Sequence, residues 1–150
     1  MIKHLLGLSC ICIFFAFCNN PSGNSADTKP VAVAGDVHCY MYNDSSNIIS
    51  LRASFLKDSV SGALNYDIYQ KDKNSGTIAG IMKDDILVAE YTFISEGKTS
   101  VRQVAFKKSG STLVGGVGEM EEKDGKVVFK DISKLDFSQP VVLAEVDCNK

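Results

Sequence analysis

Arg102 is the charged side chain best placed to recognise a ligand, because the pattern around it puts it on the inner face of a predicted strand. It shares the parity of the apolar residues Val104 and Phe106. A guanidinium on a buried face needs a partner, and we expect Glu96 at the adjoining turn or Glu119 on the next strand to supply it. Two interpretations stay open. Arg102 either borders a pocket for an anionic or amphipathic ligand, or it forms a structural ion pair or faces solvent.

Four aromatic side chains share the predicted inner faces with Arg102. Together with Arg102 and Glu119 they form the candidate ligand-binding set, which comprises Arg102, Tyr66, Tyr91, Phe93, Phe106 and Glu119. The alternative is that the aromatic rings only fill the interior, since a barrel of about eight strands is just wide enough for its own side chains.

The sequence offers no recognisable catalytic or metal-binding motif. His38 is the only histidine after residue 18, and no serine or cysteine has the context of a known nucleophile. The acidic run at 119–124 lacks the ligand spacing of a calcium loop, and no CxxC pair occurs. We therefore expect no enzyme, no cofactor and no metal site. A net charge of −2 without a basic patch also argues against a nucleic-acid partner.

The first eighteen residues have the pattern of an export signal. Met1 and Lys3 supply positive charge, and residues 5–17 contain no charged side chain. This apolar run is shorter than the roughly 20 residues of a membrane-spanning helix. A signal segment therefore fits better than a permanent span.

The end of that run resembles a bacterial lipoprotein signal, in which a cysteine is acylated and becomes the first mature residue. Cys18 is followed by a polar, turn-rich segment, and Ala16 fits the pattern, whereas Phe17 stands where a small residue is usual. Cys10, preceded by Ser9, is the alternative, but it would leave a much shorter apolar segment. The resemblance implies a lipid anchor on Cys18 and a place in the cell envelope. We expect this place to be the outer membrane, on its periplasmic or its surface side.

The composition divides the chain into a signal at 1–18, a flexible tether at 19–36 and a folded domain at 37–150. The tether is rich in Asn, Ser, Gly and Ala, which cannot bury enough surface to fold; a flexible coil of that length would span roughly 25 Å. Of five cysteines only Cys39 and Cys148 lie in the domain. An even pair in an oxidising compartment predicts a disulfide.

Apolar and polar residues alternate along the domain with a period of two, which is typical of half-buried antiparallel strands. Polar turn segments separate the runs. There are about nine strand-like runs and no convincing helical periodicity. The runs cover 37–42, 47–57, 64–68, 77–83, 87–93, 101–107, 112–120, 126–132 and 141–148.

These runs predict an all-β domain, an antiparallel up-and-down meander closed into a β-barrel of about eight strands. Closure removes the unpaired edges of so long a meander. A bridge from Cys39 in the first run to Cys148 in the last would join the seam, because a disulfide needs Cα atoms roughly 4.4–6.8 Å apart. Gly115, Gly116 and Gly118 indicate strong coiling or a bulge. An open sandwich of the same strands is the alternative.

Part of this pattern resembles an uncharacterised group of small lipoproteins from Bacteroidota, over about residues 37–148. The residues that carry the resemblance are Gly76-Thr77, Gly80, Asp84-Asp85, Leu87, Tyr91, Ser95-Glu96-Gly97 and Arg102. It implies a calycin-type barrel similar to lipocalins, although the chain has no Trp and so lacks the lipocalin opening motif. Separately, Asp58-Ser59-Val60 resembles the O-glycosylation signal of exported Bacteroidota proteins, which implies Ser59 as the acceptor.

Two functional hypotheses of different classes follow. The first is a lipid-anchored envelope protein whose barrel binds a small apolar or amphipathic ligand or a peptide. The second is a structural or interaction lipoprotein, such as an inhibitor or an assembly factor, with a filled barrel. In that case the outer face would carry an apolar patch of Tyr69, Ile81, Ile86 and Val88. A continuous cavity bordered by Arg102 would favour the first hypothesis.

Overall fold

Ten strands and one short 3₁₀ turn form the part of the chain that the computed structural model describes, residues 35–138 and 141–149. The strands are β1 (Asp36–Asn43), β2 (Ile48–Leu56), β3 (Ser59–Asp67), β4 (Asn74–Lys83), β5 (Ile86–Ser95), β6 (Lys98–Ser109), β7 (Thr112–Gly116), β8 (Met120–Lys123), β9 (Lys126–Phe129) and β10 (Val142–Val146), with the turn η1 (Ile132–Lys134) between the last two. The predicted signal, Cys18 and residues 19–34 of the tether lie outside the described residues. Within the described part, no helix is long and apolar enough to cross a membrane.

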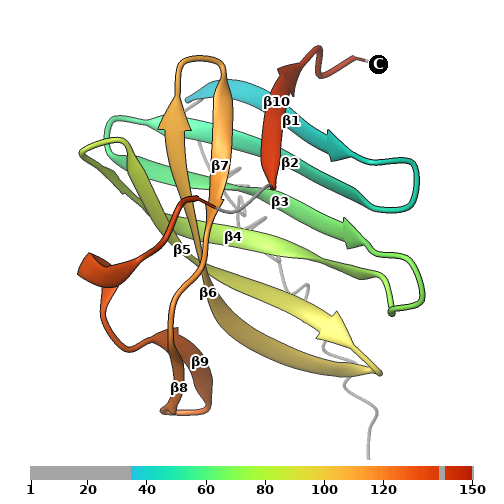
Figure 1. The fold of residues 1–150 in the computed structure, drawn as a ribbon, viewed down its shortest axis with the longest axis vertical. Helices are drawn as coiled ribbons and strands as arrows, with labels where there is room; N and C mark the ends of the chain where they lie inside the picture. The colour runs from blue at the N-terminus through green and yellow to red at the C-terminus, as the bar shows by residue number, and fades with distance from the viewer. Residues whose placement is uncertain (1–34, 139–140, 150) are drawn as a thin grey trace, which may run out of the picture. The chain divides into compact units, whose positions relative to one another are not determined.

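Eight of the strands close into an antiparallel barrel, which confirms the predicted fold class (Figure 1). Around the barrel the order is β5-β4-β3-β2-β1-β10-β7-β6, and β6 pairs again with β5. Strands β1 to β7 follow one another as antiparallel neighbours, and β10 completes the wall by pairing with β7 on one side and β1 on the other. The barrel, and not the open sandwich, is therefore the fold.

Local sequence explains why these strands form. In β5 the buried residues Leu87, Ala89 and Tyr91 alternate with more exposed ones. Asp84 and Asp85 connect β4 to β5 with φ values of 49° and 62°, the backbone of a two-residue type I′ turn, whose twist matches that of the flanking strands. Aspartate tolerates this conformation better than most residues. The tight turn sets the register that keeps the apolar face of β5 inside.

Gly76 and Gly80 allow β4 to bend closely against β5. A Cβ atom on Gly76 would lie 2.8 Å from Cβ of Phe93, and one on Gly80 would lie 2.5 Å from Cβ of Ala89. Side chains do not tolerate such distances, so glycine at both positions permits the coiling that closes the barrel.

The glycine-rich run at 112–120 forms two strands, so its prediction as one strand is wrong. β7 ends at Gly116, where the ring of Phe137 packs so closely that a Cβ atom would lie 2.6 Å from a ring carbon. Val117 then pairs with Asp136 instead of with β6. As a result β8 and β9 form a separate antiparallel hairpin outside the eight-stranded wall.

This β8–β9 hairpin lies beside β6, to which it is joined by a single parallel pair between Arg102 and Val127. The run predicted at 126–132 is also too long, since β9 ends at Phe129. The carboxylate of Asp131 accepts a hydrogen bond from the backbone N–H of Ser133 and caps η1, which turns the chain away.

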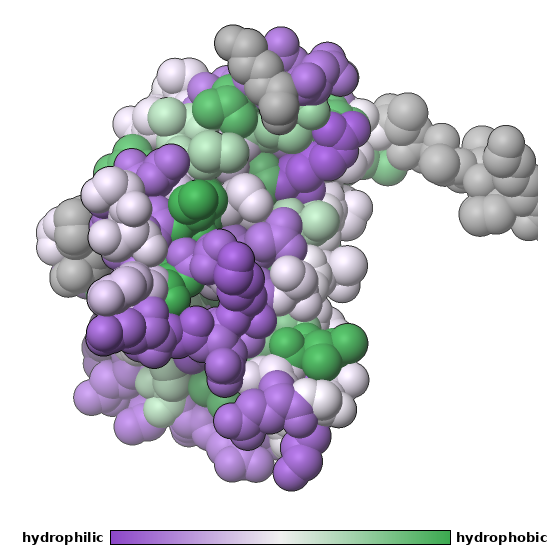
Figure 2. Space-filling view, turned by 90° about the vertical axis from the view of Figure 1, so that its right-hand side faces the viewer, coloured by the Kyte–Doolittle hydropathy of each residue, from purple (hydrophilic) through white to green (hydrophobic). Residues whose placement is uncertain are grey.

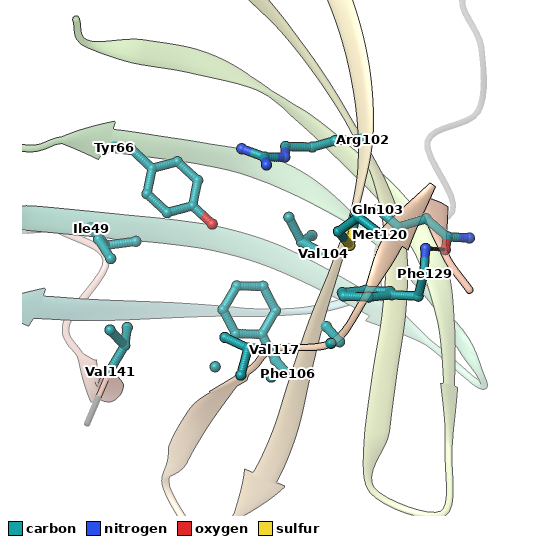
Figure 3. A pocket seen from close by; sticks show the side chains of 14 residues that line it. Ile49, Tyr66, Arg102, Gln103, Val104, Phe106, Val117, Met120, Phe129 and Val141 are labelled. Carbon is teal, nitrogen blue, oxygen red and sulfur yellow. Dashed lines mark hydrogen bonds between the residues drawn. The ribbon is translucent and has the colours of Figure 1, made fainter. Parts of the chain in front are cut away.

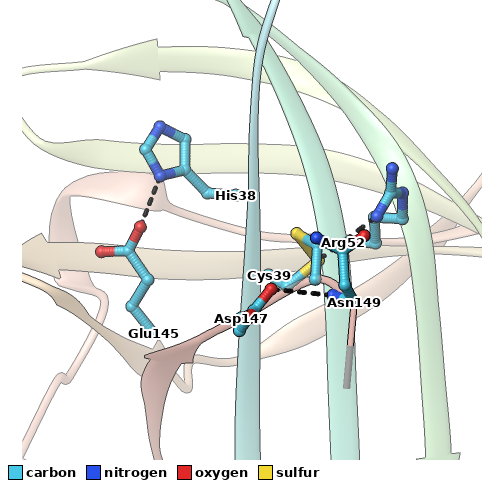
Figure 4. The surroundings of a disulfide bond; sticks show 7 residues. His38, Cys39, Arg52, Glu145, Asp147 and Asn149 are labelled. Atoms are coloured by element: carbon cyan, nitrogen blue, oxygen red, sulfur yellow. Dashed lines mark hydrogen bonds and ion pairs between the residues drawn. A yellow bond between two sulfur atoms is a disulfide. The ribbon is translucent and has the colours of Figure 1, made fainter.

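The seam of the barrel lies between β1 and β10 and is closed covalently. Cys39 is opposite Val146 and is bonded to Cys148, with Cα atoms 5.2 Å apart, which confirms the predicted disulfide (Figure 4). Next to it His38 Nδ1 and Glu145 Oε1 lie 2.5 Å apart across the same seam. The first and last strands are thus joined by a disulfide and by a hydrogen bond between side chains.

Replacing both bridge cysteines, Cys39→Ala with Cys148→Ala, is expected to lower the free energy of unfolding. The bridge joins residues 109 apart, and a loop of that length is worth about 4–5 kcal/mol in the chain-entropy model. In urea unfolding followed by circular dichroism, the midpoint should fall and the slope m should rise, because the unbridged chain exposes more surface when unfolded. Reductant should lower the midpoint of the unaltered protein and leave the double variant unchanged. A midpoint that does not move on replacement would contradict this account.

Candidate functional site

A cavity of about 470 Å³ opens where β6 and β7 separate (Figure 3). Small-molecule sites measure roughly 300–1,000 Å³. Inner-face residues of the barrel and residues of the β8–β9 hairpin line it together, among them Ile49, Tyr66, Arg102, Phe106, Met120 and Phe129. The predicted barrel is therefore not completely filled by its own side chains.

The cavity exists because β6 is much longer than the strand beside it. β6 runs from Lys98 to Ser109, but β7 pairs with it only from Ala105 onward. The first half of β6 thus has a full partner on one side, β5, and only the single pair with Val127 on the other. This incomplete pairing leaves an opening in the wall.

Arg102 lies on the inner parity of β6, as predicted, and lines the cavity. It stands directly opposite Tyr91 on β5, and its guanidinium extends toward Tyr66 across the cavity (Figure 3). The residue as a whole is exposed, because the opening in the wall lets solvent reach it. Within the described part of the chain, Arg102 has neither an ion pair nor a hydrogen bond through its side chain.

The two glutamates predicted to pair with Arg102 are placed elsewhere, so that expectation is wrong. Glu119 follows the break after β7; its side chain is 82% exposed, and its Oε2 lies 3.3 Å from Nζ of Lys130. Glu96 is an exposed residue of the β5–β6 turn, with a φ of 50°. Solvent takes the place of a protein partner at Arg102, which removes the need for a buried ion pair.

The four predicted aromatic residues divide between the cavity and the core. Tyr66 and Phe106 line the cavity, whereas Tyr91 and Phe93 lie behind it. The rings of Tyr91 and Phe93 stack with centroids 4.7 Å apart, and Tyr91 meets Tyr66 edge-on at 5.7 Å. The stacked pair therefore holds the ring of Tyr66 in position at the cavity wall.

Two buried polar atoms near this end of the barrel lack hydrogen-bond partners among the described residues. They are the hydroxyl of Tyr91, whose side chain is only 1% exposed, and Oδ1 of Asn74, the residue opposite Tyr66 on β4. Burial raises the pKa of Tyr91, and the nearby charge of Arg102 opposes that rise. Arg102 therefore lies near polar atoms that have no hydrogen-bond partner among the described residues.

Sequence reasoning missed the contribution of the β8–β9 hairpin, which supplies Met120 and Phe129 to the cavity. The hairpin is held against β6 by a hydrogen bond of 2.9 Å from the backbone N–H of Phe129 to Oε1 of Gln103. Met120 and Phe129 lie directly opposite each other across the Asp124 turn. The turn could be predicted from the local sequence, but the docking of the hairpin on β6 depends on contacts between residues that are distant in the sequence.

The outer surface carries the other predicted residues. Ser59, at the start of β3, is exposed. In the predicted apolar patch, Ile81 is 54% exposed and pairs with the half-buried Val88, and Ile86 is half-buried. Tyr69, 67% exposed, lies beyond the other end of β4, so the patch is not continuous. One face of the molecule is hollowed, with apolar side chains inside the hollow and polar ones around it (Figure 2).

In the described part of the chain, no three His, Cys, Asp or Glu side chains are grouped so that they could hold a metal ion. Comparison of the chain with protein-family models, with curated proteins and with solved structures finds no match. The functional argument therefore depends on the geometry and chemistry of the cavity.

Tyr66→Phe is expected to remove part of the stability loss at alkaline pH. Burial, with a smaller effect of Tyr91, raises the pKa of Tyr66 from 10.0 to about 12, against the opposing charge of Arg102. The folded protein keeps the phenolic proton after the unfolded chain has lost it. The free energy of unfolding should therefore fall between about pH 10 and pH 12, by roughly 3 kcal/mol for this group, and stay unaffected below that range.

Urea midpoints measured at about pH 9 and about pH 11.5 would test this linkage. Tyr69→Phe, at an exposed position, is the matched control and should decline between the two pH values as much as the unaltered protein does. An equal decline in Tyr66→Phe would show that Tyr66 does not carry the effect.

Proposed function

We propose that this chain is a lipid-anchored protein of the cell envelope, attached to the outer membrane through Cys18, and that its barrel binds a small amphipathic molecule. Arg102 is the observation that carries the proposal. Its guanidinium lines a mostly apolar cavity and has no ion-pair partner in the described residues. A cation in that position favours a ligand with an acidic group.

The polar end of the site is formed by Arg102 and Tyr66. The hydroxyl of Tyr66 makes no hydrogen bond to another described residue, and the two side chains approach each other across the cavity (Figure 3). A guanidinium presents several N–H donors in a fork that matches a carboxylate or phosphate, and a phenol adds one more. An oxyanion placed between the two groups would accept hydrogen bonds from both.

The remainder of the cavity suits an apolar body. Ile49 on β2, Val104 and Phe106 on β6, and Val141 just before β10 contribute aliphatic and aromatic surface. Transfer of apolar surface into such a site contributes about 25 cal/mol per Å². A molecule with one acidic end and one apolar end therefore matches the cavity along its length.

The proposed role is binding, not catalysis. No serine, cysteine, histidine or carboxylate is among the described residues that line the cavity. His38 lies at the barrel seam, where it pairs with Glu145. A role as an interaction lipoprotein receives less support, because the exposed residues Tyr69 and Ile81 lie at opposite ends of β4.

The proposed location in the cell envelope depends on the sequence pattern of the predicted signal at residues 1–18. The apolar run ending at Cys18 and the resemblance to small Bacteroidota lipoproteins with calycin-type barrels both support export and lipidation. Ser59 is proposed as an O-glycosylation acceptor, and its exposure at the start of β3 would leave it open to modification.

Arg102→Met is expected to weaken the binding of decanoate about tenfold. A charge-assisted hydrogen bond contributes about 1.5–3 kcal/mol, and the lower value applies because solvent reaches the guanidinium. Isothermal titration calorimetry with sodium decanoate measures the change. Decanol has the same chain without the charge, so it should bind the variant and the unaltered protein equally.

Arg52→Met is the matched control for this experiment, because Arg52 is the other arginine of the chain. It is exposed beside the disulfide, with Nη1 3.7 Å from Sγ of Cys39 (Figure 4). Its replacement should leave decanoate affinity unchanged. The proposal fails if decanoate does not bind, or if it binds equally well to Arg102→Met.

Cys18→Ala is expected to abolish incorporation of a fatty-acid label and to release the protein from the membrane fraction, because the anchor would lose its acylated residue. Metabolic labelling with an alkyne fatty acid, followed by fractionation, measures both. Cys10→Ala is the control and should remain labelled. Label retained in Cys18→Ala and lost in Cys10→Ala would assign the anchor to Cys10 instead.

A further inference from the structure

The cavity continues beyond the barrel interior. Met120 and Phe129 belong to the β8–β9 hairpin, which is not part of the eight-stranded wall, yet they line the same space as Ile49 and Tyr66 on inner faces of the barrel. The space can cross the wall because β6 has no β7 partner before Ala105. In Figure 3, Met120 and Phe129 lie on the far side of Val104 from Tyr66.

The hairpin is fixed in this position before any ligand arrives. Gln103 on β6 accepts the hydrogen bond from the backbone of Phe129 in a part-buried setting. Lys126 Nζ and Glu90 Oε1 lie 2.6 Å apart, but both side chains are more than 40% exposed, so this ion pair contributes little. The Gln103 bond, together with the backbone pair of Arg102 with Val127, therefore holds the hairpin more firmly than this ion pair does.

The chemistry of the outer part of the cavity differs from that of the Arg102 end. Val117, Met120 and Phe129 present apolar side chains, and Gly118 adds none. The side-chain oxygen of Gln103 is already bonded to the hairpin. A thioether side chain such as that of Met120 adapts well to a flexible apolar partner.

We infer that the β8–β9 hairpin forms a second, apolar subsite, which takes the distal end of an unbranched alkyl chain whose acidic group lies at Arg102. This inference rests on the proposed function and adds the class of ligand, a long-chain alkyl carboxylate. A ligand with polar groups at both ends is disfavoured, because the side chains of Val117, Met120 and Phe129 offer its second polar group no hydrogen bond. Met120 and Phe129 are then the residues that determine chain-length preference.

A chain-length series of hexanoate, decanoate and tetradecanoate tests the inference by calorimetry on the full domain. Each methylene that enters an apolar site should tighten binding about fourfold. Met120→Gln keeps the length of the side chain but makes it polar. It should weaken tetradecanoate about tenfold and leave hexanoate unchanged, because only the longer chain reaches the hairpin. Phe129→Leu, which trims the opposite strand of the hairpin, should act in the same direction.

Val127→Thr is the matched control, since Val127 is on the same hairpin but not in the cavity wall. It should bind all three carboxylates as the unaltered protein does. If Met120→Gln and Phe129→Leu weaken all three equally, or weaken none, the hairpin subsite is refuted while binding at Arg102 stands. If no carboxylate binds to the unaltered protein, the proposed function and the subsite both fail.

Discussion

Closure of the sheet is the constraint on which the rest of the structure depends, and it is unevenly strong around the barrel. β1 pairs with β2 along its whole length, whereas β10 pairs with β1 only from Cys39 to Met41 and with β7 only from Thr112 to Val114. The disulfide lies just beyond this weak ladder. It therefore fastens the strand of the eight-stranded wall that has the fewest paired residues, and without β10 the barrel would have two open edges.

The cavity arises from the same unevenness. Where β7 stops, the wall beside β6 is completed by a hairpin that is held by one backbone pair, Arg102 with Val127, and by the side chain of Gln103. A continuous strand in that place would pair with β6 and close the gap, leaving Arg102 between two strands and needing a buried counter-ion. The break after Gly116 thus both opens the space and keeps the guanidinium solvated. At the break Val117 pairs with Asp136, and the ring of Phe137 packs on Gly116.

The sequence predicted the features that depend on near neighbours. Alternation and turn residues such as Asp84 and Asp85 identified the strands, and parity alone placed Arg102 on an inner face. The sequence could not predict that Glu119 lies away from Arg102, because the position of Glu119 depends on where β7 ends. β7 ends where Val117 pairs with Asp136, which lies nineteen residues further along the chain. The wall formed by the β8–β9 hairpin escaped prediction for the same reason, since its docking on β6 is a tertiary contact.

The two ends of the cavity would contribute different amounts of free energy to the binding of a ligand. An exposed ion pair contributes about 0–1 kcal/mol and a charge-assisted hydrogen bond about 1.5–3 kcal/mol. Each buried methylene contributes about 0.8 kcal/mol, so four of them already match or exceed the whole effect of Arg102. Most of the affinity for a long-chain ligand must then come from the apolar walls. In the proposed binding mode, Arg102 and Tyr66 would orient the acidic end of the ligand, and the hairpin would set how much of the chain the site can hold.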